Sequence, residues 1–389
     1  MTTTVLTRHS DSILPFSPTI THFCKHGSSA RPWRLCYTMI WRIVVALLLL
    51  SFTAPPPVVL AVSPIRAYNV DPSSVSVSGL SSGGFMAAQL GVASSDVFKT
   101  GFGVFAGGPY DCARNQTFTM CVGNQTPSIT IPTANMRAWS SSKAIASVEN
   151  LASRRIFMQV GTADSTVGVN PMKQLRAQLS AFVDDPAHQV SFVTLDGAAH
   201  VFPTDFDGEG DNSCGESAEP WISNCRYDGA GAVLGWMYGG NLTARNEGSP
   251  TGTTVSFDQT GEFGARGLDS TGYLYVPSAC QRGGSNNNQV CRLHVALHGC
   301  LQSHSQIGSK FMDNTGYKKW ADTNNIIILF PQAKVDNSQH IIWNGIPIPN
   351  ASACWDWVGW YGADADQRGG TEMAAIVNQV RAIVRGFDG

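Results

Sequence analysis

Hydrophobic and polar positions alternate in several short runs of this chain, which is the pattern of β-strands. Residues 75–78 alternate valine and serine, and further apolar runs predict strands at 155–160, 190–195, 271–277, 293–297 and 326–331. Apolar residues three and four positions apart in 371–385 predict an amphipathic helix, and 85–90 and 311–324 are also expected to be helical. This alternation of strands and helices predicts an α/β fold, with a mostly parallel sheet flanked by helices.

The stretch Gly-Leu-Ser-Ser-Gly-Gly at 79–84 joins the first predicted strand to the first predicted helix. In that context a G-x-S-x-G sequence forms a nucleophile elbow, a sharp turn that exposes the serine hydroxyl at the sheet edge. Gly79 and Gly83 would supply the small residues that flank Ser81. The pattern alone is weak in a chain with 39 glycines, and a glycine-rich turn is the alternative. The flanking strand and helix favour Ser81 as a nucleophile.

A serine hydroxyl needs a base that accepts its proton. His200 follows the strand at 190–195, and Asp164 follows the strand at 155–160, so both lie where α/β sheets place site residues. The chain order Ser81, Asp164, His200 is that of α/β-hydrolases. The alternatives are a surface-loop role for His200 and a helix N-cap role for Asp164.

Acyl transfer also needs backbone N–H donors for the oxyanion, and Ser82, directly after the nucleophile, is expected to give one. The second donor normally comes from a His-Gly loop that precedes the nucleophile. Here the matching His298-Gly299 follows His200 instead. We interpret His298 as shaping the oxyanion turn, although a role as a rival base is the alternative.

The elements that usually precede the nucleophile strand therefore come after the histidine. This order predicts a circularly permuted α/β-hydrolase fold, with 246–252 near the joint between its two halves. A separate carboxyl-terminal domain is the alternative interpretation.

The amino-terminal region has the composition of a targeting segment. An apolar run at 43–52 follows Arg42 and precedes three prolines and a small-residue pattern at 59–61. It predicts a secretory signal peptide within a leader, 1–61, whose removal leaves 62–389 as a single catalytic domain. A membrane anchor is the alternative, although the run is about half the length of a span.

Eight of the ten cysteines follow this leader, and an even number in an exported chain indicates disulfides. Sequential pairing is favoured, because three of its four pairs, Cys112–Cys121, Cys214–Cys225 and Cys280–Cys291, enclose short loops; the fourth pair is Cys300–Cys354. Eight cysteines allow many other pairings. N-x-[ST] sequons predict glycosylation at Asn115, Asn124, Asn241 and Asn350.

A net charge of −2 and 14% charged residues leave no basic stripe for nucleic acid. The acidic stretch 205–216 nearly matches a calcium-binding loop, but it lacks flanking amphipathic helices and contains Cys214, which favours a surface loop. No C-x-x-C spacing indicates zinc. We therefore expect neither a metal nor an organic cofactor.

Six segments together resemble the secreted, single-domain, fungal-type poly(3-hydroxybutyrate) depolymerases, in the same permuted order across 65–388. They are 68–72, 79–93 (GLSSGGFMAAQLGVA), 104–110, 161–168 (GTADSTVG), 294–300 (HVALHGC) and 354–360. The resemblance implies a triad of Ser81, Asp164 and His200. It also implies an oxyanion hole made by the amides of Ser82 and Cys300, and a substrate crevice lined by Trp357.

The resulting prediction is an extracellular serine esterase that cleaves an insoluble aliphatic polyester through an acyl-serine intermediate. We expect a monomer that needs no nucleic acid and no membrane as a partner. An esterase for feruloyl or acetyl groups of cell-wall polysaccharide is the alternative enzyme, because related folds serve both substrates. A catalytically inactive protein that adsorbs to polymer is the alternative outside enzymes.

Overall fold

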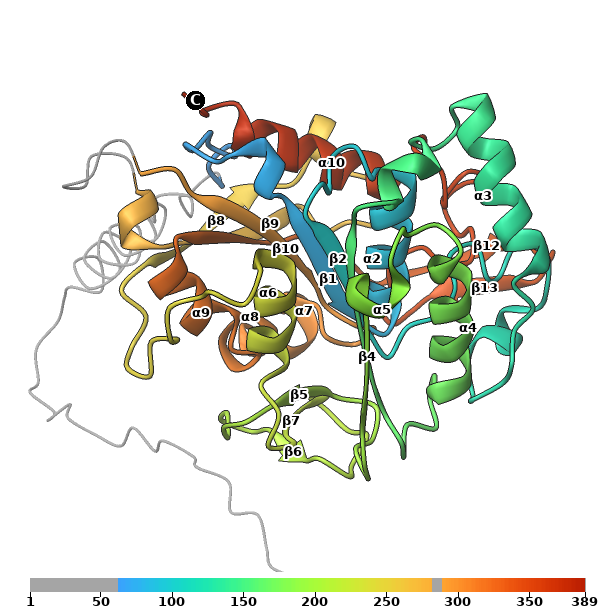
Figure 1. The fold of residues 1–389 in the computed structure, drawn as a ribbon, viewed down its shortest axis with the longest axis horizontal. Helices are drawn as coiled ribbons and strands as arrows, with labels where there is room; N and C mark the ends of the chain where they lie inside the picture. Colours follow the sequence, from blue (N-terminus) through green and yellow to red (C-terminus); the bar gives the residue numbers. More distant parts are fainter. Residues whose placement is uncertain (1–61, 282–288, 389) are drawn as a thin grey trace, which may run out of the picture. The chain divides into compact units, whose positions relative to one another are not determined.

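The computed structural model describes residues 62–281 and 289–388, so the predicted leader at 1–61 lies outside the described residues. The described residues form one compact unit around an eight-stranded sheet with the order β4-β3-β2-β1-β10-β11-β9-β8 (Figure 1). In chain order these strands are β1 (Ser76–Leu80), β2 (Gly101–Phe105), β3 (Arg155–Gly161), β4 (Val190–Leu195), β8 (Thr253–Asp258), β9 (Thr271–Val276), β10 (Arg292–Leu297) and β11 (Ile326–Phe330).

The order of these strands supports the permuted arrangement. β1, the strand before the candidate nucleophile, lies in the middle of the sheet between β2 and β10 and is parallel to both. β11 continues the parallel part. At this edge β9 pairs antiparallel with β11, and β8 pairs antiparallel with β9. Strands from both halves of the chain thus share one sheet, and nothing in this topology divides off a separate carboxyl-terminal domain.

Two smaller sheets lie outside the main one. They consist of β5 (Phe202–Thr204), β6 (Asn212–Ser213) and β7 (Ile222–Asn224), and of the hairpin β12 (Asp336–Ile341) and β13 (Pro347–Asn350). Short 3-10 helices occur at Pro72–Ser74, Phe118–Cys121, Val148–Leu151, Gly261–Phe263 and Ser278–Cys280.

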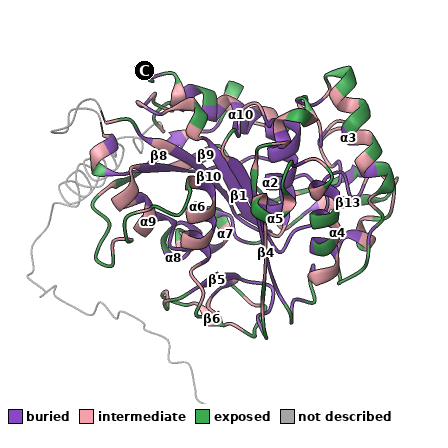
Figure 2. Ribbon diagram, in the orientation of Figure 1, coloured by how far each residue is buried: buried purple, intermediate pink, exposed green. Residues whose placement is uncertain are grey.

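Helices cover both faces of the main sheet (Figure 1). α2 and α10 pack together over one face, and α6 and α9 pack together over the other. The α-helices are α2 (Ser82–Ala93), α3 (Thr130–Ser142), α4 (Val169–Ser180), α5 (Pro186–Gln189), α6 (Gly229–Tyr238), α7 (His304–Ile307), α8 (Lys310–Asn314), α9 (Tyr317–Asn324) and α10 (Thr371–Val384). Figure 2 shows the central strands buried between these layers.

The prediction of one helix over 311–324 is wrong, because the segment is divided into α8 and α9. Gly316, between them, has a φ of 85°, in the left-handed region that ends a right-handed helix. The segment 246–252, expected near the joint, belongs to the connection between α6 and β8.

The valine–serine alternation of β1 does not indicate a strand with one solvent-exposed face, because all five of its residues are buried. Its serine face is satisfied by a buried histidine of the neighbouring strand. The Ser76 and Ser78 hydroxyls each lie 2.7 Å from a ring nitrogen of His294, and Ser78 also bonds to the Tyr317 hydroxyl of α9. Burial lowers the pKa of His294 to about 3, so the ring is neutral at physiological pH.

The two ends of the described chain lie together, as a permuted fold requires. The amide of Tyr68 donates to the carbonyl of Ile383 in α10 at 2.8 Å, and the amide of Asp388 donates to the Asn69 side chain at 3.3 Å. Among the described residues, no helix is long and apolar enough to cross a membrane.

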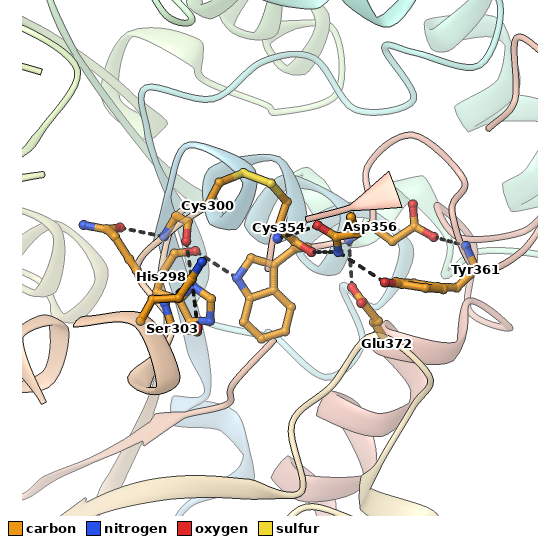
Figure 3. Close-up of a disulfide and its surroundings, with 12 residues drawn as sticks. His298, Cys300, Ser303, Cys354, Asp356, Tyr361 and Glu372 are labelled. Atoms are coloured by element: carbon orange, nitrogen blue, oxygen red, sulfur yellow. Dashed lines mark hydrogen bonds between the residues drawn. A yellow bond between two sulfur atoms is a disulfide. The ribbon is translucent and has the colours of Figure 1, made fainter. Parts of the chain in front are cut away.

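A buried pair of carboxyl groups anchors the segment after β13 to α10 (Figure 3). The Asp356 carboxylate accepts hydrogen bonds from the backbone amides of residues 358–361, and the amide of Asp356 donates to Glu372 Oε2 at 2.7 Å. Burial raises the pKa of Asp356, and the four amide donors oppose this rise by stabilising its anion. Burial and this neighbouring charge raise the pKa of Glu372 well above its ordinary value, so Glu372 holds the proton of the pair.

We expect the Glu372→Gln variant to remove a pH-dependent loss of stability. Glutamate in the unfolded chain releases its proton near pH 4.3, whereas folded Glu372 retains it, so the parent loses stability as the pH rises above that value. The melting temperature of Glu372→Gln minus that of the parent should therefore increase by several degrees between pH 5 and pH 8, measured by calorimetry. A difference that stays constant over this range would contradict the assignment.

Candidate active site

Ser81 occupies the sharp turn between β1 and α2, with a φ of 56° and a ψ of −120°. Positive φ is costly for a residue with a side chain, and such strain concentrates at functional sites. The Ser81 amide donates to the Phe105 carbonyl at the end of β2 at 2.9 Å, which fixes the turn to the sheet. This is the geometry of a nucleophile elbow.

The glycines on both sides of Ser81 are required by close packing. A Cβ on Gly79 would lie 2.3 Å from the Gly83 carbonyl oxygen, and a Cβ on Gly83 would lie 2.4 Å from the His298 carbonyl oxygen. Neither backbone oxygen has room to move aside. The turn therefore fits against the end of β10 only because these two positions lack side chains.

Asp164 and His200 meet at the carboxyl ends of β3 and β4. His200 Nδ1 lies 2.8 Å from Asp164 Oδ2, and both side chains are almost fully buried. Burial by itself would raise the pKa of Asp164. The hydrogen bonds from His200 and from the amides of Thr166 and Val167 outweigh it and hold that pKa below its ordinary value. Asp164 thus remains an anion that can orient the imidazole and stabilise its protonated form.

Ser81 and His200 line one pocket of about 150 Å³. Its other lining residues are Leu80, Thr166, Trp221, Gly299, Cys300, Leu301 and Gln302. Asp164 is not among them and reaches the pocket only through its hydrogen bond to His200 Nδ1. The structure therefore brings the predicted nucleophile, base and orienting acid together at the sheet edge.

The turn after β10, which carries Cys300 and is the candidate oxyanion turn, lies directly beside Ser81. A Cβ on Gly299 would be 3.3 Å from the Ser81 Cβ. The Gly299 amide donates to Gln302 Oε1 at 2.7 Å, and the Leu301 amide donates to the Ser352 carbonyl at 2.7 Å. Cys300 lies between these two residues in the chain and lines the pocket. Ser82 is the first residue of α2, where a backbone N–H has no acceptor within its own helix.

A disulfide and an indole connect this turn to the segment after β13 (Figure 3). Cys300 bonds to Cys354, and Trp355 Nε1 donates to the His298 carbonyl at 2.8 Å. The other disulfides join Cys112 to Cys121, Cys214 to Cys225 and Cys280 to Cys291, so the four pairings favoured by the sequence are those of the structure.

Two predicted site roles meet difficulties in the structure. Trp357 stacks on Phe85 of α2 with ring centroids 4.2 Å apart, and it is not among the residues that line the pocket at Ser81. Asn350 is 1% exposed, and its side chain bonds to both backbone groups of Cys354, so a glycan on Asn350 does not fit the folded chain. The sequons at Asn115, Asn124 and Asn241 are exposed.

Trp221 and Gln302 are among the pocket residues that sequence reasoning missed. Gln302 Nε2 donates to the Pro220 carbonyl at 2.7 Å, so one buried amide connects the oxyanion turn to the loop that carries Trp221. Trp221 has a φ of 56°, a second strained residue at this pocket. Gln302 lies two residues after Cys300 and could have been noticed as a polar residue in the turn, whereas no pattern indicates Trp221.

The alternative roles at other histidines and at the acidic loop find no support. His298 has both ring nitrogens engaged, by the Gly299 carbonyl and the Ala333 amide, so it is not available as a base for Ser81. In the loop 205–216, Asp211 bonds to Asn314 and to the Gly208 amide. Within the described residues, no group of three or more potential ligands could hold a metal ion.

Comparison with known proteins identifies the family of the chain. The model of the prolyl oligopeptidase family matches residues 62–210. A polyhydroxybutyrate depolymerase of Talaromyces funiculosus is 63% identical over 329 residues, which are 85% of this chain and 95% of that protein.

Two solved structures match with a TM-score of 0.81 and 62% identity, covering 84% of this chain and 100% of theirs. One is the crystal structure of a PHB depolymerase from Penicillium funiculosum, and the other is a PHB depolymerase variant complexed with an R3HB trimer. The chain therefore belongs to the polyhydroxybutyrate depolymerase family, with an α/β-hydrolase-type fold.

Proposed function

We propose that this chain is a serine esterase that hydrolyses poly(3-hydroxybutyrate) or a similar aliphatic polyester. The observation that carries the proposal is the Asp164–His200 pair at the pocket of a serine held in a strained strand-to-helix turn. Membership of the depolymerase family, and the trimer complex of a relative, favour a polyester over feruloyl or acetyl groups of cell walls. The intact site likewise favours an enzyme over an inactive adsorbing protein.

The reaction uses the three side chains in sequence. His200 Nε2 accepts the Ser81 proton as the hydroxyl oxygen attacks an ester carbonyl, and Asp164 holds Nδ1–H so that Nε2 faces the serine. The imidazolium then gives its proton to the departing alcohol oxygen, which leaves an acyl-serine. Water attacks that ester with the same base, and Ser81 recovers its proton as the hydroxy acid leaves.

The oxyanion formed in both steps needs donors that are already in place. The amides of Ser82 and Cys300 are the proposed pair, one at the start of α2 and the other in the turn after β10. Each such donor contributes roughly 3–4 kcal/mol to the transition state. Trp357, stacked on Phe85 of α2, is retained as a proposed wall of the crevice for the polymer's repeat unit.

We further propose that the enzyme is secreted as a monomer after removal of the leader at 1–61, and that 62–389 acts as its single catalytic domain. The four disulfides and the three exposed sequons support an oxidising, extracellular location. We also propose that the surface of the catalytic fold itself makes contact with solid polymer.

Exposed apolar side chains near the pocket suit this contact. Ile341 is 73% exposed and Ile346 is 41% exposed, both on the β12–β13 hairpin, while Leu301 and Val335 are also exposed. Leu301 lines the pocket, and the other three come after β11 in the chain, which is parallel to β10 and β1. We therefore assign these side chains to adsorption on the polymer.

The Ser81→Ala variant should lose ester hydrolysis, because removal of a catalytic serine costs roughly a million-fold in kcat. Two assays are run on the parent and the variant: clearing of a poly(3-hydroxybutyrate) film and hydrolysis of p-nitrophenyl butyrate. Their melting temperatures are the control for folding. The parent should do both and the variant neither. A parent that cleaves the soluble ester but not the film would contradict the polyester assignment while retaining the serine chemistry.

The double variant Ile341→Ser/Ile346→Ser should bind polymer powder roughly tenfold more weakly, because two exposed apolar side chains are lost from the contact. Its kcat/KM on p-nitrophenyl butyrate should equal that of the parent. Val290→Ser/Phe387→Ser is the matched control, since these exposed residues lie away from the Ser81 edge. Equal loss of adsorption in both double variants would show that the hairpin has no special role.

A further inference from the structure

The peptide between Gly299 and Cys300 carries the N–H group that the proposed function assigns to the oxyanion. In a planar trans peptide the C=O and N–H groups point in opposite directions. Whatever holds the Gly299 carbonyl therefore also sets the direction of the Cys300 N–H. Rotation of this one peptide would remove a donor from the pocket without any change to the triad.

His298 holds that carbonyl. Its Nδ1 lies 2.7 Å from the Gly299 oxygen, and because a carbonyl only accepts, Nδ1 carries the proton and donates it. The Gln302 amide donates to the same oxygen over a longer distance, 3.3 Å. The carbonyl is thus fixed on the side of the His298 ring, which leaves the Cys300 N–H on the opposite side.

The protonation state of His298 is fixed by a second contact. The Ala333 amide donates to His298 Nε2 at 3.1 Å, so Nε2 must be without a proton. The ring is fully buried, and it packs against Trp355 and Phe311. Burial lowers the pKa of His298 to about 4, in spite of the bond to Gly299, so the neutral Nδ1–H tautomer is present at physiological pH.

The remaining contacts of this turn fix its flanks. Trp355 Nε1 bonds to the His298 carbonyl, Gln302 Oε1 to the Gly299 amide, and Ser352 to the Leu301 amide. These bonds hold the peptides before and after the Gly299–Cys300 peptide. The disulfide to Cys354 restrains the Cys300 side chain and not the direction of its amide.

We propose that His298 is a positioning residue, which aims the Cys300 N–H at the oxyanion by holding the Gly299 carbonyl through Nδ1–H. This inference rests on the proposed esterase function. It assigns His298 no contact with substrate and no proton transfer in the reaction. Its effect is confined to the transition state, because a ground-state ester carbonyl develops little charge for the donor to stabilise.

Two substitutions separate the two ring contacts of His298. In His298→Asn, the new side-chain amide would place an N–H donor near the former Nδ1 position, toward Gly299. His298→Gln would instead place an acceptor near the former Nε2 position, toward Ala333. Both variants keep a polar side chain at a buried site, so each is the control for the stability loss of the other.

The experiment measures kcat and KM on p-nitrophenyl butyrate together with the inhibition constant of butylboronic acid, whose tetrahedral adduct on serine occupies the oxyanion site. For His298→Gln we expect kcat to fall about 10- to 100-fold with KM nearly unchanged, up to the loss expected when one oxyanion donor is removed, and boronate inhibition to weaken in parallel. His298→Asn should retain most of both. Loss of kcat that follows melting temperature equally in both variants, or no loss in either, would overturn the proposal.

A measurement on the parent covers the case in which a variant fails to fold. Nitrogen-15 NMR of histidine-labelled parent chain should show His298 as the Nδ1–H tautomer, with its proton signal shifting when butylboronic acid binds. An Nε2–H tautomer, or a signal insensitive to bound boronate, would overturn the proposal. A parent that neither hydrolyses the ester nor binds the boronate would instead contradict the esterase function itself.

Discussion

The parallel pairing of β1 with β10 is the constraint on which the site depends. Gly79 lies opposite Leu297 in this register, so the two strands end together and their following turns leave the sheet side by side. One turn holds Ser81 and the other holds Cys300. The missing side chains of Gly79, Gly83 and Gly299 allow these turns to touch, and a one-residue slip would separate the proposed nucleophile from the proposed oxyanion donor.

The segment after β13 restrains one of these two turns and is itself fixed to a helix. It reaches the oxyanion turn through the Cys300–Cys354 disulfide and the Trp355 indole, and it is fixed to α10 through Asp356 and Glu372 (Figure 3). The buried proton on Glu372 lets two carboxyl groups share this space. Donors that stabilise a transition state must be in position before charge develops. The contacts of this segment would hold the proposed donor in position without touching the substrate.

The sequence predicted six strands of the main sheet but not β2 or β8. It also predicted the sharp turn at Ser81 and the placement of Asp164 and His200 just after strands, because these depend on local periodicity and on short spacings. It also predicted the permuted order, because His298-Gly299 could be recognised as the usual oxyanion motif although it follows His200 in the chain. It failed where tertiary contacts decide. Gly316 divides a helical pattern, and Glu372 resembles a solvated first-turn residue of α10 but is buried. The burial of Asn350 likewise follows from the fold of the segment around Cys354 and not from its sequon.

The most direct test of the account is labelling of the mature chain by a fluorophosphonate, followed by peptide mapping. The account predicts one adduct, on Ser81, and none when Ser81 is replaced by alanine. Slower labelling is expected when His200 is replaced, because the hydroxyl then lacks its base. An adduct on another serine, or continued ester hydrolysis by a chain in which Ser81 remains unlabelled, would contradict the assignment of the nucleophile.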